Sequence, residues 1–365
     1  MDYPAERRRN LARCLDAEGL DALLVSSPVN VTYLTGFTGD SSYLLLGRRQ
    51  TVLVSDSRYT QQIADECPGL EAHIRPPTRT VHQAAAEVIE RLGCRSIGFE
   101  SNHLTVADWQ TLRDLAKAVD WKPGSDRIER LRAVKDPSEV AAIREAIDIA
   151  QRAFAVFRAL LRPDDREKDL CDALDHYMRR AGGQGASFPP IVAVGERAAL
   201  PHAPPTERAV GEADLLLVDW GASGRLYKSD LTRVLATRRI SPKLEEVYGV
   251  VLTAQERALR KIRPGAQAKD VDAEARTAIA EAGYGDYFGH GLGHGIGLQI
   301  HEAPMLRPNA DVVLEPGMVI TVEPGVYLPG WGGVRIEDDV LVTPDGCEVL
   351  TTVAKDLASI TVFGR

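Results

Sequence analysis

Two segments of the C-terminal half each predict a β-hairpin that brings acidic side chains together. The first, residues 214–235, reads DLLLVDWGASGRLYKSDLTRVL. Its apolar β-forming residues flank Gly224-Arg225, a Gly-X pair typical of a type II′ hairpin turn. Counting outward from that turn sets Asp219 opposite Asp230. Directly opposed side chains lie about 5 Å apart on one face of a sheet, so these two carboxylates would repel each other.

The second segment, residues 319–342, repeats this arrangement with glutamates. It reads VITVEPGVYLPGWGGVRIEDDVLV, and a loop centred on Gly330 sets Glu323 opposite Glu337. Each acid taken alone is compatible with a structural role, such as starting a turn or ending a strand. Two hairpins with facing acids favour another interpretation, in which four carboxylates converge on cations that offset their repulsion.

A histidine cluster lies between the two hairpins. Residues 289–304 read GHGLGHGIGLQIHEAP and contain His290, His294 and His301. The spacing of His290 and His294 would suit a helix, but the glycines between and after them disfavour one. In an extended chain four residues span about 13 Å, so we expect one metal-ligating histidine. The others would stabilise charge or carry protons.

Four carboxylates and one imidazole suit two divalent cations, because the charges nearly cancel. Oxygen-rich ligation favours Mn²⁺, with Co²⁺, Fe²⁺ and Zn²⁺ also compatible. Two ions about 3.5–4 Å apart share a water, lower its pKa and direct hydroxide at a carbonyl. The pattern therefore predicts a hydrolase of amides or related acyl bonds.

The composition is typical of a globular protein. It predicts binding to neither nucleic acid nor membranes. The 365 residues are 44% apolar and 26% charged, with a net charge of −8 that disfavours polyanionic partners. No apolar run approaches the roughly 18 residues of a membrane span, and no secretory signal is visible. The five cysteines are far apart and form no CxxC, which indicates reduced thiols and a cytoplasmic protein.

Helix and strand signals predict two domains. Residues 1–123 alternate helical and strand patterns and predict an α/β domain. The segment 121–126, WKPGSD, is interpreted as a break that ends the preceding helix, and 124–137 as a linker. Ser138 or Asp136 would cap the helix that follows. Residues 138–365 predict an α+β domain with pseudo-two-fold internal symmetry, because two helices twice precede a strand-rich stretch, 187–235 and then 287–343.

Four segments resemble the signature blocks of the pita-bread metallopeptidases. These are DWGASGRLYKSDLTR, HGLGHGIGLQIHEAP, MVITVEPGVY and VRIEDDVLV. The N-terminal NVTYLTGFTG and DSRYTQQ are similar to the creatinase-like domain of the proline-specific branch, which includes Xaa-Pro dipeptidase (prolidase) and aminopeptidase P. The resemblance implies a pita-bread fold for the catalytic domain and two bound divalent metal ions.

The resemblance also implies a metal-ligand set. Asp219 would chelate one ion and Asp230 would bridge the two. His294 would be the single imidazole ligand. Glu323 would bind one ion and act as general base, and Glu337 would bridge.

Further residues match substrate-binding or catalytic positions of the family. The resemblance gives His202 a role in proton transfer or substrate contact, His290 in stabilising the oxyanion, and His301 in contacting the substrate. Arg335 would hold the substrate carboxylate or the charge network. Trp220 departs from the family pattern, but it faces away from Asp219 and leaves the ligand set intact.

The implied activity is cleavage of the Xaa-Pro bond of dipeptides by a hydroxide that bridges the two metals. Aminopeptidase P, which acts on longer Xaa-Pro peptides, is the alternative, and a metal-free creatinase-like or non-catalytic binding protein is a third. In relatives a partner subunit shapes the proline pocket, which implies a homodimer. Tyr33, Asp40 and Tyr43 are candidates for that contribution.

Overall fold

The computed structural model describes residues 2–363, which divide into two compact units. One unit ends at Arg132 and the other begins at Ala133. The segment 124–137, predicted as a linker, contains a helix, α6 (Arg127–Ala133). Among the described residues no helix has the length and apolar character needed to cross a membrane.

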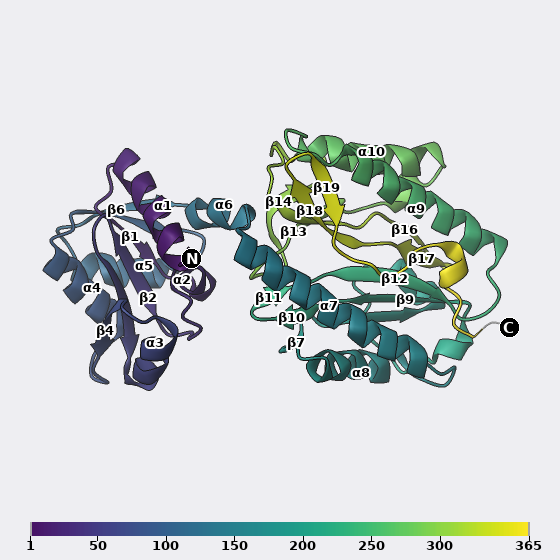
Figure 1. Ribbon diagram of the computed structural model, residues 1–365, viewed down its shortest axis with the longest axis horizontal. Coiled ribbons are helices and arrows are strands. Elements are labelled where there is room, and N and C mark those ends of the chain that lie inside the picture. The colour runs from purple at the N-terminus through teal and green to yellow at the C-terminus, as the bar shows by residue number, and fades with distance from the viewer. Residues whose placement is uncertain (1, 364–365) are drawn as a thin grey trace. The chain divides into compact units, whose positions relative to one another are not determined.

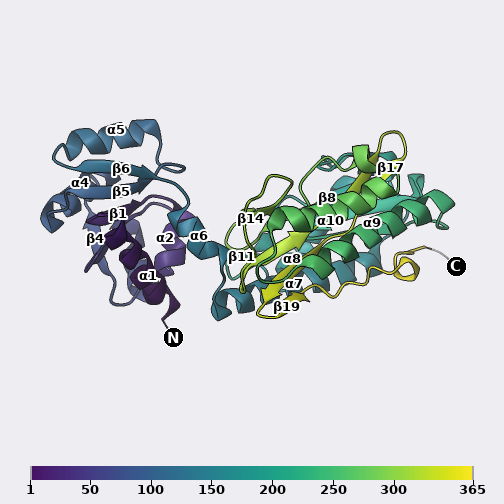
Figure 2. The same ribbon diagram turned by 90° about the horizontal axis from the view of Figure 1, so that it is seen from above.

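The N-terminal unit is a mixed six-stranded sheet with helices on both faces (Figure 2). The strand order is β4-β3-β2-β1-β5-β6, and the central β1 is buried along its whole length. Helices α1 and α2 lie on one face, and α4 and α5 lie on the other (Figure 2). The strands are β1 (Ala22–Val25), β2 (Tyr43–Gly47), β3 (Thr51–Asp56), β4 (Glu71–Arg75), β5 (Ser96–Glu100) and β6 (Asp120–Gly124). The helices before α6 are α1 (Tyr3–Ala17), α2 (Pro28–Thr35), α3 (Thr60–Glu66), α4 (Val81–Leu92) and α5 (Val106–Leu115).

The predicted break at 121–126 was wrong for its first four residues. Helix α5 already ends at Leu115, and the residues from Asp120 to Gly124 form β6, which runs parallel to β5. Because β6 lies at the edge of the sheet, Pro123 can occupy it without depriving a neighbouring strand of a hydrogen-bond donor.

The C-terminal unit repeats a pattern of two helices followed by strands (Figure 1), as the sequence predicted. Helices α7 and α8 precede the first set of strands, and α9 and α10 precede the second. The helices are α7 (Pro137–Leu160), α8 (Glu167–Arg180), α9 (Pro242–Lys261) and α10 (Ala268–Glu281). The first strands are β7 (Gly185–Ala186), β8 (Ile191–Val194), β9 (Leu215–Trp220), β10 (Ala222–Gly224), β11 (Tyr227–Lys228) and β12 (Leu231–Ala236). The second set is β13 (Gly293–Gly295), β14 (Glu302–Leu306), β15 (Val319–Val322), β16 (Gly325–Leu328), β17 (Gly332–Arg335), β18 (Asp338–Thr343) and β19 (Gly346–Val349).

The side chain that caps α7 is Asp136, one of the two residues predicted for this role. Its carboxylate accepts hydrogen bonds from the backbone N–H groups of Ser138 and Glu139. Pro137 follows as the first helical residue, where a missing N–H costs nothing.

The register predicted for the second hairpin is confirmed. Strand β15 pairs with β18 so that Val322 faces Asp338, and β16 pairs with β17 so that Gly325 faces Arg335. Both pairings keep the register that sets position 323 opposite position 337.

The turn predicted for the first hairpin was one residue too early. The turn residues are Arg225 and Leu226, whose φ values of 45° and 76° suit a type I′ turn. Gly224 is used instead for close packing, since a Cβ there would lie 3.1 Å from Ile149 and 3.3 Å from the Ala146 backbone on α7.

This change of turn moves the register of the first hairpin by two residues. Thr232, and not Asp230, lies opposite Asp219. Because side chains alternate along a strand, a shift of two residues keeps Asp230 on the same face, one diagonal step from Asp219. The two acids therefore still meet.

The opposite face of β9 packs against α7. Trp220 is fully buried, stacks on Phe154 with ring centroids 4.0 Å apart, and donates its indole N–H to the Ala150 carbonyl. It faces away from Asp219, as predicted. A bridge between Thr232 and Glu337 joins the strands of the two halves beside the acids.

Candidate active site

One pocket of the C-terminal unit, about 1080 Å³ in volume, is lined by all the candidate metal ligands and catalytic residues of the C-terminal half. Both hairpins and the glycine-rich segment contribute to its wall. The singled-out lining residues are His202, Asp219, Asp230, His290, His294, His301, Glu323, Arg335 and Glu337.

Asp230, His294 and Glu337 form a group with the spacing of metal ligands. One ligand atom from each lies within 4.8 Å of the others. Glu323 borders this group, because its Oε1 lies 3.5 Å from Nε2 of His294. Asp219 is also buried, and among residues 2–363 its Oδ1 has no hydrogen-bond partner. A cation would satisfy that oxygen.

The carboxylic acids of the pocket are difficult to ionise together. Burial raises the pKa of Asp230 and of Glu337 well above their usual values, and neighbouring carboxylates raise both further. Burial, with Asp219 nearby, raises the pKa of Glu323 to about 8. Divalent cations would offset this repulsion and keep the acids ionised. The donor set therefore fits the implied metal ions.

Asp338, the residue after Glu337, has a lowered pKa where that of Glu337 is raised. Asp338 is also buried, which by itself would raise its pKa, yet Arg233 and Lys355 hold that pKa at about 2. Adjacent strand residues point to opposite faces, so the two acids meet different surroundings.

His294 lies in an extended strand, as its glycine neighbours predicted, and β13 spans only Gly293–Gly295. Burial and the adjacent His301 lower the pKa of His294 to about 4, so its imidazole is neutral at pH 7. Nδ1 lies 3.1 Å from the Gly295 carbonyl oxygen. A proton on Nδ1 makes that hydrogen bond and leaves the Nε2 lone pair directed at the acids.

Tyr327 is a pocket residue that the sequence reasoning missed. Its hydroxyl lies 2.9 Å from Nε2 of His290 and accepts a 2.8 Å hydrogen bond from Nη1 of Arg335. Nη2 of Arg335 donates to Asp219 over 2.6 Å. The alternation from Glu323 through Gly325 to Tyr327 is the signal that could have placed this tyrosine on the acidic face.

Two threonines were missed in the same way. Thr232 donates its hydroxyl to Glu337 over 2.6 Å and accepts a 3.0 Å hydrogen bond from Nε of Arg335. The Thr321 hydroxyl lies 3.3 Å from Glu323 and accepts the backbone N–H of His294. Each threonine lies two residues from an acid of the pocket, on the same face.

Two of the remaining candidates lie on the exposed wall of the pocket. His202 and His301 are exposed on the pocket wall, and the His301 ring centroid lies 4.3 Å from that of His294. In the N-terminal unit, Asp40 is exposed and accepts the Tyr59 hydroxyl, while the Tyr43 hydroxyl lies 3.2 Å from His82. The role of that unit in substrate binding stays a prediction.

The fold and the pocket define a metal-dependent hydrolase, and the comparisons specify its family. Residues 141–344 match metallopeptidase family M24, and residues 7–134 match the creatinase/prolidase N-terminal domain. The chain therefore belongs to metallopeptidase family M24. The expected pita-bread catalytic domain with a creatinase-like N-terminal domain is confirmed.

Similar proteins match over nearly the whole chain. The Xaa-Pro dipeptidase of Pyrococcus horikoshii is 33% identical over 98% of this chain and 100% of its own length. A solved structure of an Xaa-Pro dipeptidase from Bacillus anthracis has a TM-score of 0.93 and 38% identity, covering 98% of this chain and 99% of that one. The X-Pro aminopeptidase of Thermotoga maritima has a TM-score of 0.88 and 35% identity, covering 94% and 99%.

The family resemblance gives His290 a role in stabilising the oxyanion, and replacing it by alanine is therefore expected to lower kcat by about 10²–10³-fold, the usual cost of losing such a group. Metal content should stay near that of the wild type, because His290 bonds Tyr327 and lies outside the ligand group. Elemental analysis beside steady-state kinetics checks both expectations. A variant purified without metal would show instead that His290 is a ligand.

Proposed function

We propose that this chain hydrolyses the Xaa-Pro bond of dipeptides with two divalent metal ions. Asp219, Asp230, His294, Glu323 and Glu337 would hold the ions. The observation that carries the proposal is that three buried acids, the partly buried Glu323 and one neutral imidazole share a single pocket. Similarity to Xaa-Pro dipeptidases supports the choice of substrate.

Bound divalent ions would polarise the substrate carbonyl and lower the pKa of the attacking water. Glu323 borders the ligand group and would accept the proton of that water, then deliver it to the leaving nitrogen. Thr321 orients this carboxylate through its hydroxyl. Arg335 has its guanidinium nitrogens bonded to Asp219, Tyr327 and Thr232, which favours a role in the charge network over binding of a substrate carboxylate.

His290 would need a proton on Nε2 to donate a hydrogen bond to an oxyanion. Its Nδ1 lies 2.8 Å from the Gly291 carbonyl and its Nε2 lies 2.9 Å from the Tyr327 hydroxyl. With a proton on Nδ1, Nε2 accepts from Tyr327 and offers no donor. If the tyrosine hydroxyl turned away, Nε2 would still carry no proton, so the Tyr327 O–H itself would be the group that donates to the oxyanion in this step.

Manganese is the proposed metal, because four carboxylates outnumber the single imidazole. The proposal includes a homodimer and a cytoplasmic location, both carried over from the sequence analysis. Light scattering of the purified protein would test the dimer, and a single-chain mass would contradict it.

Aminopeptidase activity on longer Xaa-Pro peptides is the second candidate. The pocket exceeds the 300–1,000 Å³ typical of drug-sized ligands, so it has room beyond a dipeptide. A T. maritima protein described as an X-Pro aminopeptidase is also similar. Supplying Ala-Pro and Ala-Pro-Ala with each of Mn²⁺, Co²⁺, Fe²⁺ and Zn²⁺ separates the two activities. Cleavage of the tripeptide alone would overturn the dipeptidase proposal.

A metal-free creatinase-like or non-catalytic protein is disfavoured, since every predicted ligand position carries a ligating side chain. Purified protein without transition metal, which neither binds added metal nor gains activity from it, would support that reading.

A further inference from the structure

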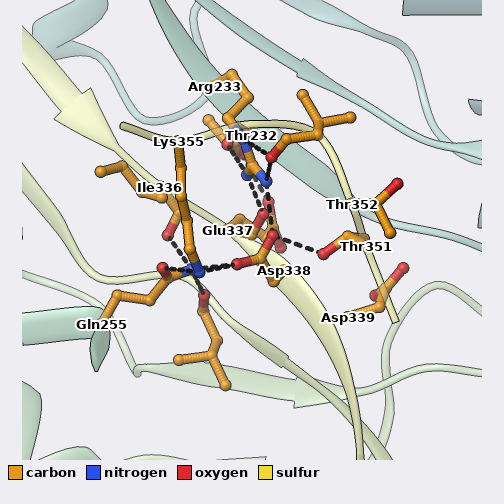
Figure 3. Close-up of polar contacts among 12 residues, drawn as sticks. Thr232, Arg233, Gln255, Ile336, Glu337, Asp338, Asp339, Thr351, Thr352 and Lys355 are labelled. Atoms are coloured by element: carbon orange, nitrogen blue, oxygen red, sulfur yellow. Dashed lines mark hydrogen bonds and ion pairs between the residues drawn. The ribbon is translucent and has the colours of Figure 1, made fainter. Parts of the chain in front are cut away.

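A buried polar network surrounds Asp338, the residue directly after Glu337 (Figure 3). Asp338 is its centre. Its Oδ1 accepts hydrogen bonds from Nη2 of Arg233 over 2.6 Å and from the Thr351 hydroxyl over 2.5 Å. Its Oδ2 lies 2.5 Å from Nζ of Lys355. Arg233 also donates to the backbone carbonyl of Glu337 over 2.5 Å.

Gln255 connects this network to both glutamates of the second hairpin. It lies on α9 and is fully buried. Its Nε2 lies 3.2 Å from the carbonyl oxygen of Val322 and 3.3 Å from that of Ile336. These are the residues directly before Glu323 and Glu337. One amide group therefore contacts the backbone at the base of each glutamate.

The C-terminal segment 351–355 holds Gln255 and Arg233 in place. Nζ of Lys355 donates to Oε1 of Gln255 over 2.8 Å. That bond orients the side-chain amide so that Nε2 faces the two carbonyls and also Oδ2 of Asp338, which lies 3.0 Å away. The Val353 carbonyl accepts from Nη2 of Arg233 over 2.7 Å.

We propose that Gln255 is a positioning residue that fixes the spacing between Glu323 and Glu337, and that Lys355 keeps it oriented. The inference rests on the proposed metal site. Carboxylates that repel each other would drift apart in a loose backbone, and each ångström of drift weakens metal binding. Pinning both backbone segments to one amide preorganises the glutamates before a cation arrives.

The test is the affinity of metal-free protein for Mn²⁺, measured by isothermal titration. Gln255→Met keeps the side-chain volume and removes the amide, and it is expected to weaken binding about 10–100-fold, as loss of a supporting partner does. Activity at limiting Mn²⁺ should fall in parallel and return when Mn²⁺ is in excess. Lys355→Met should weaken binding in the same direction, and Lys355→Arg should restore it.

Gln151→Met is the matched control. Gln151, on α7, accepts hydrogen bonds from the backbone N–H and the hydroxyl of Thr352, so it holds the same segment without touching the carbonyls before the glutamates. Its loss should leave Mn²⁺ affinity unchanged. Equal weakening in Gln151→Met and Gln255→Met would overturn the inference, as would wild-type affinity in Gln255→Met. If that variant does not fold, wild-type affinity in Lys355→Met overturns it. If the wild-type protein bound no Mn²⁺, that result would instead contradict the proposed function.

Discussion

Glu337→Gln is expected to abolish metal binding and turnover while making the metal-free protein more stable. Glu337 and Asp230 belong to one buried group, and burial and mutual repulsion raise the pKa of both. A neutral amide removes the repulsion and can still accept the hydrogen bond from Thr232. A bound metal stabilises the transition state by several kcal/mol. Its loss is therefore expected to lower kcat by about 10³-fold or more.

Thermal unfolding in the presence of a chelator measures the gain in stability. For a domain of this size each kcal/mol moves Tm by about 2–4 °C, so a rise of that order is expected. Excess Mn²⁺ should raise Tm of the wild type but not of the variant. Glu348→Gln, at a half-exposed surface acid, is the control and should change neither property. A lower Tm in metal-free Glu337→Gln would mean that the glutamate is not under electrostatic strain.

Arg335→Met is expected to lower the free energy of unfolding of the metal-free protein by about 3–5 kcal/mol, because it leaves Asp219 buried beside no positive charge. Nη2 of Arg335 lies 2.6 Å from Asp219, and Arg335 is only 3% exposed. The substitution also removes the donors to Tyr327 and Thr232, so kcat should fall as well.

Arg144→Met is the matched control for burial. Arg144 lies the same 2.6 Å from Glu348, but the two side chains are 43% and 46% exposed. Exposed pairs of this kind contribute less than about 1 kcal/mol. Urea titration of both variants gives the comparison, and similar losses in the two would contradict the argument from burial.

The sequence predicted the second hairpin more accurately than the first. In residues 319–342 the turn signal around Gly330 marks the true hairpin loop, and the predicted register followed from it. In residues 214–235 the turn signal of Gly224 was misleading, because that glycine serves close packing against α7. The acids still met because an error of two residues preserves the face of a strand.

The sequence alone determined which side chains share the acidic face, since alternation along a strand and glycine-rich extension are local properties. It also determined the family, because the order and spacing of its motif residues match the signature blocks of that family. Only the tertiary structure decided how those acids are held. Gln255 and Lys355 reach the backbone behind the glutamates from α9 and from the C-terminal segment, and Arg335 contacts Asp219 across more than a hundred residues. Such contacts depend on how distant elements pack, and no local pattern encodes that packing.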